Sequence, residues 1–302
     1  MLKAICLGRL SYDINLVVDK MPAPGTVNEF FEKQGCGGGS AGNFGYALAK
    51  WGVSSCVAGV LGNDVYGTRI RKELEKVHID LRYIEPSYDN DTPISTIIID
   101  KSTKNHTVLN MSDKYVGLKK CDFDFSPDLI MVDGYDVIMA KSLLERFPSC
   151  LSVLDASIVT SSVAELLHKA KYAICSQEFA QSMTGVRIDY QDPKTLVELY
   201  QRLKRKNLNT EFVVTLGERG ALYCVNNQIK ISPSLKVETV DTYGCGQVFR
   251  AAFAYSILND HDLEKAVKWG CIAAGLASTK VGARTAIPSL EEIKNIYEQN
   301  YA

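Results

Sequence analysis

Four short apolar segments, separated by helix-like segments, constrain the fold of this chain more than any other feature. They occupy residues 129–134, 151–157, 171–176 and 211–217. Runs that are apolar at nearly every position suit strands that are buried on both faces, as in a parallel sheet. Amphipathic segments such as residues 193–206 lie between them. This alternation predicts an α/β protein with a mostly parallel sheet and helices on both faces.

Two pairs of predicted strands interrupt the alternation. Residues 14–18 and 27–33 flank a Pro-Ala-Pro-Gly turn, and residues 94–100 and 106–110 flank a polar loop. We expect the four strands to join into one small sheet that stands off the main body as a lid. No long linker divides the chain, so we expect one domain over residues 1–302, with lid strands inserted at about 14–34 and 94–110.

Charge and cysteine content narrow the class of protein. The formal net charge is -1, so no global positive field would attract nucleic acid or an acidic membrane surface. No apolar run has the length of a membrane span, and the N-terminus lacks the pattern of a signal peptide. The 9 cysteines form no C-x-x-C pair, and the 4 histidines show no metal-ligand spacing. These features predict a cytoplasmic protein with reduced thiols.

A glycine-bracketed turn marks a candidate anion site. A β-favouring run from residue 237 leads into Gly244, Cys245 and Gly246, and an apolar helix is predicted over residues 247–258. Backbone N–H groups at a helix start have no partner within the helix, and the helix dipole adds partial positive charge there. Gln247 stands at the mouth of this turn and would face a bound anion.

A second glycine-rich stretch, residues 35–39, leads into a helix predicted over residues 40–50. It matches neither the Walker pattern nor a dinucleotide fingerprint. Asn43, one turn into the helix, can donate and accept, which suits a polyhydroxylated ligand. Asp13 comes just past the C-terminal end of a short buried-type strand predicted at residues 3–8, in the zone where open α/β sheets bind ligands. From these residues alone, the stretch is a ligand site or a tight turn, and Asp13 binds a ligand or caps a turn.

The motifs fall in a specific order along the chain: Asp13, then GGGSAGN, GNDVYG, TLGERG, DTYGCGQVF and GART. This order resembles the ribokinase/PfkB family of sugar kinases over essentially the whole chain. The most specific part is the match of DTYGCGQVF to the family pattern DTxGAGDxF. Gly62, Asp64 and Gly67 match the family's GxDxxG element. The C-terminal half, including KVGARTAIPS, is similar to a branch that contains ketohexokinase-like and sulfofructose-kinase-like enzymes.

The resemblance implies a ribokinase-like three-layer sandwich with a small β-sheet lid. It also implies transfer of the γ-phosphoryl group from ATP, with Mg²⁺, to a hydroxymethyl group of a sugar. The residues that match the sugar site are Asp13, Gly38, Gly39 and Asn43. Those that match the nucleotide site are Ser176, Thr215, Gly217 and Gly220. The anion hole matches Gly244, Cys245 and Gly246. A monovalent-cation site, for K⁺, matches Asp241 and the backbone near Tyr243, with the loop at 282–284.

The chain departs from the family at the catalytic base, where Gln247 stands in place of aspartate. An amide is not a useful base near pH 7, so we expect turnover lower by at least about 10²–10⁴-fold. Binding of sugar and nucleotide would survive. Three explanations remain open: an engineered substitution, a natural relative that binds sugar or nucleotide as a non-catalytic sensor, or a neighbouring carboxylate that serves as the base.

Three further positions are ambiguous. In the family's NxxE motif, Ser176 replaces the asparagine and Phe179 the glutamate, and Glu178, one residue away, is the candidate Mg²⁺ contact. Cys245 replaces an alanine, as a reactive thiol at a helix start or as a small buried residue. Arg250 pairs with an anionic group or lies along the helix surface.

The exposed edges of the lid also invite pairing, which predicts a homodimer through the lid.

Overall fold

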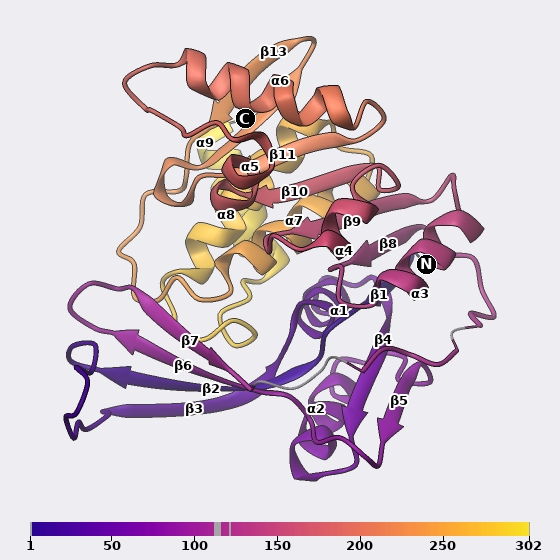
Figure 1. Cartoon of the computed structure of the whole chain (residues 1–302), viewed down its shortest axis with the longest axis vertical. Helices are drawn as coiled ribbons and strands as arrows, with labels where there is room; N and C mark the ends of the chain where they lie inside the picture. The colour runs from indigo at the N-terminus through magenta and orange to yellow at the C-terminus, as the bar shows by residue number, and fades with distance from the viewer. Residues whose placement is uncertain (1, 112–115, 121, 302) are drawn as a thin grey trace.

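The alternating apolar segments form one large sheet in the computed structural model, which describes residues 2–111, 116–120 and 122–301. Within these residues the sheet has nine strands in the order β13-β12-β11-β10-β9-β8-β1-β4-β5 (Figure 1). Neighbours from β11 to β5 are parallel, whereas β11, β12 and β13 pair antiparallel. The strand bounds are β1 Lys3–Leu7, β4 Ser54–Gly62, β5 Ile84–Ser87, β8 Leu129–Val132, β9 Leu151–Ala156, β10 Tyr172–Ser176, β11 Glu211–Thr215, β12 Ala221–Val225 and β13 Gln228–Ser232.

Helices cover both faces of this sheet, which confirms the predicted three-layer arrangement. Alternate residues of β1 enter two separate cores: Ala4 and Cys6 face one, and Ile5 and Leu7 face the other. The first core is closed by α1 Ser40–Lys50, α2 Val65–Glu75, α7 Cys245–Leu258, α8 Leu263–Ala277 and α9 Leu290–Tyr301. The second core is closed by α3 Val137–Arg146, α4 Ser161–Leu166, α5 Gln177–Thr184 and α6 Lys194–Lys206.

A separate small sheet carries the lid and projects from the body of the molecule (Figure 1). Its strands are β2 Ser11–Val18, β3 Glu32–Gly38, β6 Ile94–Asp100 and β7 His106–Asn110, in the order β3-β2-β6-β7. The prediction that two separate strand pairs join into one sheet is therefore confirmed. Its inner pair, β2 and β6, is parallel, and the two outer pairs are antiparallel.

The second lid strand was placed too early by the sequence pattern. Residues 27–31 lie outside it, and β3 instead runs through the glycine-rich stretch that was expected to be a loop. These strand positions require glycine because side chains from other segments occupy the space that a Cβ would fill. An added Cβ would lie 1.9 Å from Arg284 Nη1 at Gly37 and 2.2 Å from the Asp13 carboxylate at Gly38.

Asp64 links the body to the lid at the start of α2. Its Oδ1 accepts hydrogen bonds from Gly67 N at 2.7 Å and Thr92 Oγ1 at 2.9 Å, and its Oδ2 accepts one from Thr92 N at 2.6 Å. Thr92 lies two residues before β6, so one carboxylate both caps a helix and anchors the segment that leads into a lid strand. Burial raises the pKa of Asp64, but these hydrogen bonds outweigh it and leave the pKa below its ordinary value.

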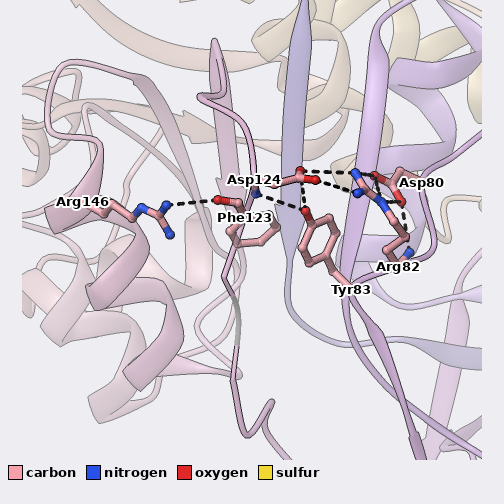
Figure 2. Close-up of polar contacts among 6 residues, drawn as sticks. All are labelled: Asp80, Arg82, Tyr83, Phe123, Asp124 and Arg146. Atoms are coloured by element: carbon pink, nitrogen blue, oxygen red, sulfur yellow. Dashed lines mark hydrogen bonds and ion pairs between the residues drawn. The ribbon is translucent and has the colours of Figure 1, made fainter.

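At the opposite, amino-terminal edge of the sheet, an ion-pair cluster ties two loops together (Figure 2). Arg82 lies 2.7 Å from both Asp80 and Asp124, and Tyr83 Oη donates to Asp124 at 2.9 Å. The Arg82 side chain is 60% exposed, so the cluster is well solvated and stabilises the fold only weakly. We assign it a structural role. Within the described part of the chain, no helix combines the length and apolarity needed to span a membrane.

Replacing Asp64 with alanine should lower the free energy of unfolding by about 1–2 kcal/mol, because it removes a helix cap and the tie to Thr92 together. Guanidinium unfolding would measure the change. Asp262→Ala is the matched control, since Asp262 also caps a helix but its carboxylate accepts one hydrogen bond, from the backbone N–H of Lys265. Its loss should be smaller, at about 0.5–1 kcal/mol. Equal losses in the two variants would contradict the linking role of Asp64.

Candidate active site

The carboxyl ends of the parallel strands gather polar side chains at one edge of the sheet. Asp133 follows β8, Asp155 lies near the end of β9, and Thr215 ends β11. In open α/β sheets, ligands bind at this edge. Two of the cavities at this edge adjoin the start of α7. The first, of about 220 Å³, is called the polar cavity below, and the second, of about 510 Å³, is called the long cavity.

The polar cavity lies under the lid and is lined by hydroxyl, carboxylate and amide groups. Its lining includes Ser11, Ser95, Asp133, Tyr243 and Gln247. Asp13 lies directly beside it, because Tyr243 Oη donates to Asp13 Oδ2 at 2.8 Å. Ser11 Oγ donates to Asp13 Oδ1 at 2.9 Å. Burial raises the pKa of Asp13, and these two hydrogen bonds partly oppose that effect.

Asp133 is a residue of this cavity that the sequence reasoning missed. Its Oδ2 accepts hydrogen bonds from Arg9 N at 2.7 Å and Ser40 Oγ at 2.5 Å, and its Oδ1 accepts one from Tyr135 N at 3.0 Å. Burial raises the pKa of Asp133 to about 6, and the nearby negative charge of Asp155 adds to this effect. The carboxylate therefore holds the loop after β1 against the start of α1.

Gln247 is held by a chain of hydrogen bonds that fixes the orientation of its amide. Asn43 Nδ2 donates to Gln247 Oε1 at 2.6 Å, and Arg284 Nε donates to Asn43 Oδ1 at 3.3 Å. Because arginine can only donate, it sets which end of the Asn43 amide faces which neighbour. Asn43 then presents its NH₂ group to Gln247 and occupies the oxygen of that side chain. The Gln247 amide thus offers its own NH₂ group, a donor, to the cavity.

Arg284 belongs to the loop at 282–284 that the family resemblance assigns to a cation site, and its side chain has a further role. It is 3% exposed and lies 2.9 Å from Glu73 Oε2, which also accepts Gly37 N at 2.8 Å. Arg284 therefore joins the C-terminal loop, α1, α2 and the lid strand β3. Glu73 had no sequence signal, since it lies in an ordinary polar helix.

The glycine turn brings α7 to the junction of the two cavities. Gly244 has φ 79, and an added Cβ would lie 2.2 Å from the Cβ of Ala283, so this position favours glycine twice over. Within the described residues, the N–H groups of Gln247 and Val248 donate to Gly244 O, whereas that of Gly246 has no partner. Gly246 lines the long cavity, so its N–H is available to an anion at the helix start.

The long cavity has one polar and one apolar wall. Thr215, Gly217 and Gly220 form the polar wall, which brings together all three residues that the TxGxxG pattern predicted. The apolar wall includes Leu235 and Phe249. An apolar slot beside a group of backbone donors and hydroxyls suits an aromatic base joined to phosphates.

Asp241 braces the loops below the glycine turn. Its Oδ1 accepts Tyr243 N at 2.8 Å and its Oδ2 accepts Gly282 N at 2.9 Å. The side chain of this predicted cation-site residue is therefore committed to two backbone amides. The amides of Val240 and Asp241 both donate to Ser278 O, at 2.7 and 3.1 Å. These bonds hold the 240–243 segment against the 278–282 segment.

Two other predicted site residues lie away from the cavities. Ser176 caps α5 by accepting Phe179 N at 3.0 Å, and its Oγ donates to Ser157 O at 3.2 Å. Glu178 is exposed in the first turn of α5 and is not part of the lining of either cavity. Among the residues that the structure describes, no group of three or more His, Cys, Asp or Glu side chains could hold a metal ion. A protein-only Mg²⁺ centre therefore does not fit these residues.

Arg250 is buried in an ion pair, whereas Cys245 is half-buried and lines the long cavity. Arg250 Nε lies 2.9 Å from Asp155 Oδ1, and the two side chains are only 3% and 5% exposed. The alternative that Arg250 lies along the helix surface is therefore wrong. Burial raises the pKa of the Cys245 thiol to about 12, and the charge of Asp241 adds to this. The Cys245 thiol therefore stays protonated near neutral pH, and the helix start does not make it a reactive thiolate.

Comparison with known proteins decides the family. The sequence profile described as pfkB family carbohydrate kinase matches residues 1–290. The chain belongs to the pfkB family. This pfkB-family chain is 23% identical over 302 residues to the ribokinase of Bacillus subtilis (strain 168). The alignment covers 98% of this chain and 99% of that relative. It is 25% identical over 313 residues to the deoxyribokinase of Salmonella typhi, in an alignment that covers 97% of this chain and 98% of that relative.

A solved structure agrees with the fold of this pfkB-family chain. The ribokinase of Cryptococcus neoformans var. grubii serotype A in complex with ADP aligns with a TM-score of 0.83 at 17% identity. The alignment covers 98% of this chain and 100% of that chain. At this level of identity the likeness carries the fold, which is ribokinase-like, and not the substrate.

The half-buried Cys245 thiol should resist alkylation, because its raised pKa keeps it protonated. With a pKa of about 12 it is almost entirely protonated at pH 8, so iodoacetamide should modify it far more slowly in the native protein than after unfolding in denaturant. Peptide mass spectrometry would follow the modification at this residue. Equal rates in the native and the denatured protein would contradict the raised pKa of this thiol.

Proposed function

We propose that this pfkB-family protein transfers the γ-phosphoryl group of ATP to a hydroxymethyl group of a sugar, at a rate limited by Gln247. One observation carries the proposal. The polar cavity and the long cavity meet at consecutive residues, because Gln247 lines the first while Cys245 and Gly246 line the second. A hydroxyl in the polar cavity and a phosphate at the helix start would therefore face each other across the turn.

The surrounding groups suit the two substrates. Asp13 and Asn43 would bind sugar hydroxyls, and the absence of a side chain at Gly38 allows the backbone to approach Asp13 closely. The free N–H of Gly246 and the start of α7 would stabilise negative charge on the transferred group. Mg²⁺ usually binds through substrate phosphates and water, so it would enter with ATP. We also propose K⁺ at the backbone near Asp241 and Tyr243, and a cytoplasmic location, which suits the free cysteines.

The Gln247 amide also favours a second candidate, a non-catalytic sensor that binds sugar or nucleotide. An amide is not a useful acceptor for a hydroxyl proton near pH 7, and its oxygen already takes a hydrogen bond from Asn43. The binding surfaces are independent of that acceptor. Calorimetric binding of sugar and ADP, together with the absence of any ATP turnover, would favour the sensor. Measurable turnover by the unaltered chain would exclude it.

Restoring a carboxylate by Gln247→Asp should raise kcat by about 10²-fold, because general-base catalysis contributes roughly 10²–10⁴-fold. A coupled assay of ATP consumption over a panel of ketoses, aldoses and nucleosides would measure the change. Gln247→Glu serves as a control for side-chain length. If neither the unaltered chain nor Gln247→Asp consumes ATP with any member of the panel, the kinase proposal is wrong.

The lid carries exposed apolar side chains for which we propose a second copy of this chain as the partner. Phe30, Phe31 and Leu109 are 52%, 70% and 57% exposed, and β3 and β7 are the unpaired edges of the lid sheet. Such edges and apolar side chains favour association. Sedimentation velocity should show a dimer that Phe31→Asp weakens at least about tenfold, about 1.4 kcal/mol. Leu208→Asp, at an equally exposed site away from the lid, should leave it intact. A monomer at high concentration would contradict the proposal.

A further inference from the structure

A carboxylate other than the missing family base faces the polar cavity. Asp155 lies near the carboxyl end of β9 and lines the same cavity as Gln247. It is 5% exposed, so a hydroxyl bound there would meet it with little competing water. The motif comparison gave it no role, and its only sequence signal was an aspartate near the end of a buried strand.

Asp155 differs from Asp13 and Asp133 in having one oxygen that accepts no hydrogen bond from the described residues. Both oxygens of Asp13 accept hydrogen bonds from side chains, and both oxygens of Asp133 are also engaged. In Asp155, Oδ1 receives the Arg250 contact at 2.9 Å and Ser157 N at 3.1 Å. No described residue donates to its Oδ2, and this oxygen is not completely buried. That oxygen is therefore left for a ligand in the cavity.

Arg250 ties this carboxylate to the first turn of α7. Its Nε and Nη2 also lie 3.3 and 3.2 Å from Ile174 O, so the guanidinium is held from two sides. Its Nη1 lies behind the glycine turn, where a Cβ added to Gly246 would be 2.7 Å away. One buried arginine thus couples the position of Asp155 to the proposed phosphate site. Such a pair is costly to bury, which makes a positioning role a reasonable explanation for its presence.

We propose that Asp155 accepts the proton of the substrate hydroxyl in place of the family carboxylate that Gln247 has replaced, and that Arg250 positions it. The proposal rests on the proposed kinase function. The hydroxyl oxygen forms a bond to the γ-phosphorus of ATP, and the bond from that phosphorus to the β–γ bridging oxygen breaks. ADP leaves with the electron pair of the broken bond. The hydroxyl proton passes to Asp155 Oδ2 and then to water.

Four proteins test the proposal: the unaltered chain, Asp155→Asn, Gln247→Asp and the double variant. In the unaltered chain, Asp155→Asn should lower kcat at least about tenfold. This is less than the roughly 10²–10⁴-fold usual for a general base, because the carboxylate is also held by Arg250. In the Gln247→Asp background the same change should lower kcat less than threefold, since the introduced carboxylate serves as base. If Asp155 had only a structural role, its replacement would lower kcat by the same factor in both backgrounds, and no rescue would be seen.

Asp133→Asn is the matched control, since Asp133 lines the same cavity with both oxygens engaged. It should lower kcat by the same factor in the two backgrounds. Where the unpaired Arg250 destabilises Asp155→Asn, the neutral pair Asp155→Asn with Arg250→Gln removes both buried charges and should show the same loss and the same rescue. Thermal unfolding and calorimetric ADP binding report whether each variant is folded.

The outcomes separate this proposal from the proposed function. Loss in the unaltered background with rescue by Gln247→Asp supports Asp155 as the base. An equal loss in both backgrounds overturns it, and so does turnover by Gln247→Asp alone with none by the unaltered chain; both results leave the kinase function in place. If none of the four proteins consumes ATP with any sugar of the panel, the kinase function itself is wrong.

Discussion

The close approach of the glycine turn to the 282–284 loop is the contact on which the rest of the site depends. Gly244 meets Ala283 where any side chain would collide, and Asp241 bonds to Tyr243 N and Gly282 N on the two sides of that contact. This places the start of α7 between the two cavities. The lid reaches the same point, since His106 Nδ1 of β7 lies 3.1 Å from Thr242 Oγ1. Movement of the turn would therefore disturb the lid and both cavities together.

The buried charges of the site are arranged so that almost every one has a specific partner. Arg284 pairs with Glu73, Arg250 pairs with Asp155, and Asp133 takes its bonds from two backbone amides and Ser40. Burial of an unpaired charge would cost several kcal/mol, so these pairings fix the positions of the groups more than they add stability. With a neutral amide at Gln247, the polar cavity keeps carboxylates on the sheet edge and has none at the start of α7.

Much of the fold followed from local patterns. Apolar runs of strand length and amphipathic helices predicted the parallel sheet. The two consecutive asparagines Asn226 and Asn227 have positive φ values, 51 and 61, which suit the tight turn between β12 and β13. The lid strand β3 was misplaced because its glycines read as a loop. Their requirement comes from Asp13 and Arg284, which are distant in sequence, and no local pattern contains that information.

For the site, the chain order of motifs identified Asp13, Asn43, the TxGxxG turn and the glycine turn, because each couples a residue type to a local backbone shape. Gln247 was also visible as an amide where the family has a base. The tertiary structure alone decided what surrounds it. Asp133 and Asp155 line the same cavity as Gln247, and Arg284 and Glu73 are linked to it through Asn43. These residues come from strands, helices and loops far apart in sequence. A sequence determines which groups are present, but distance and burial set their partners and their acidity, and only the folded chain supplies those.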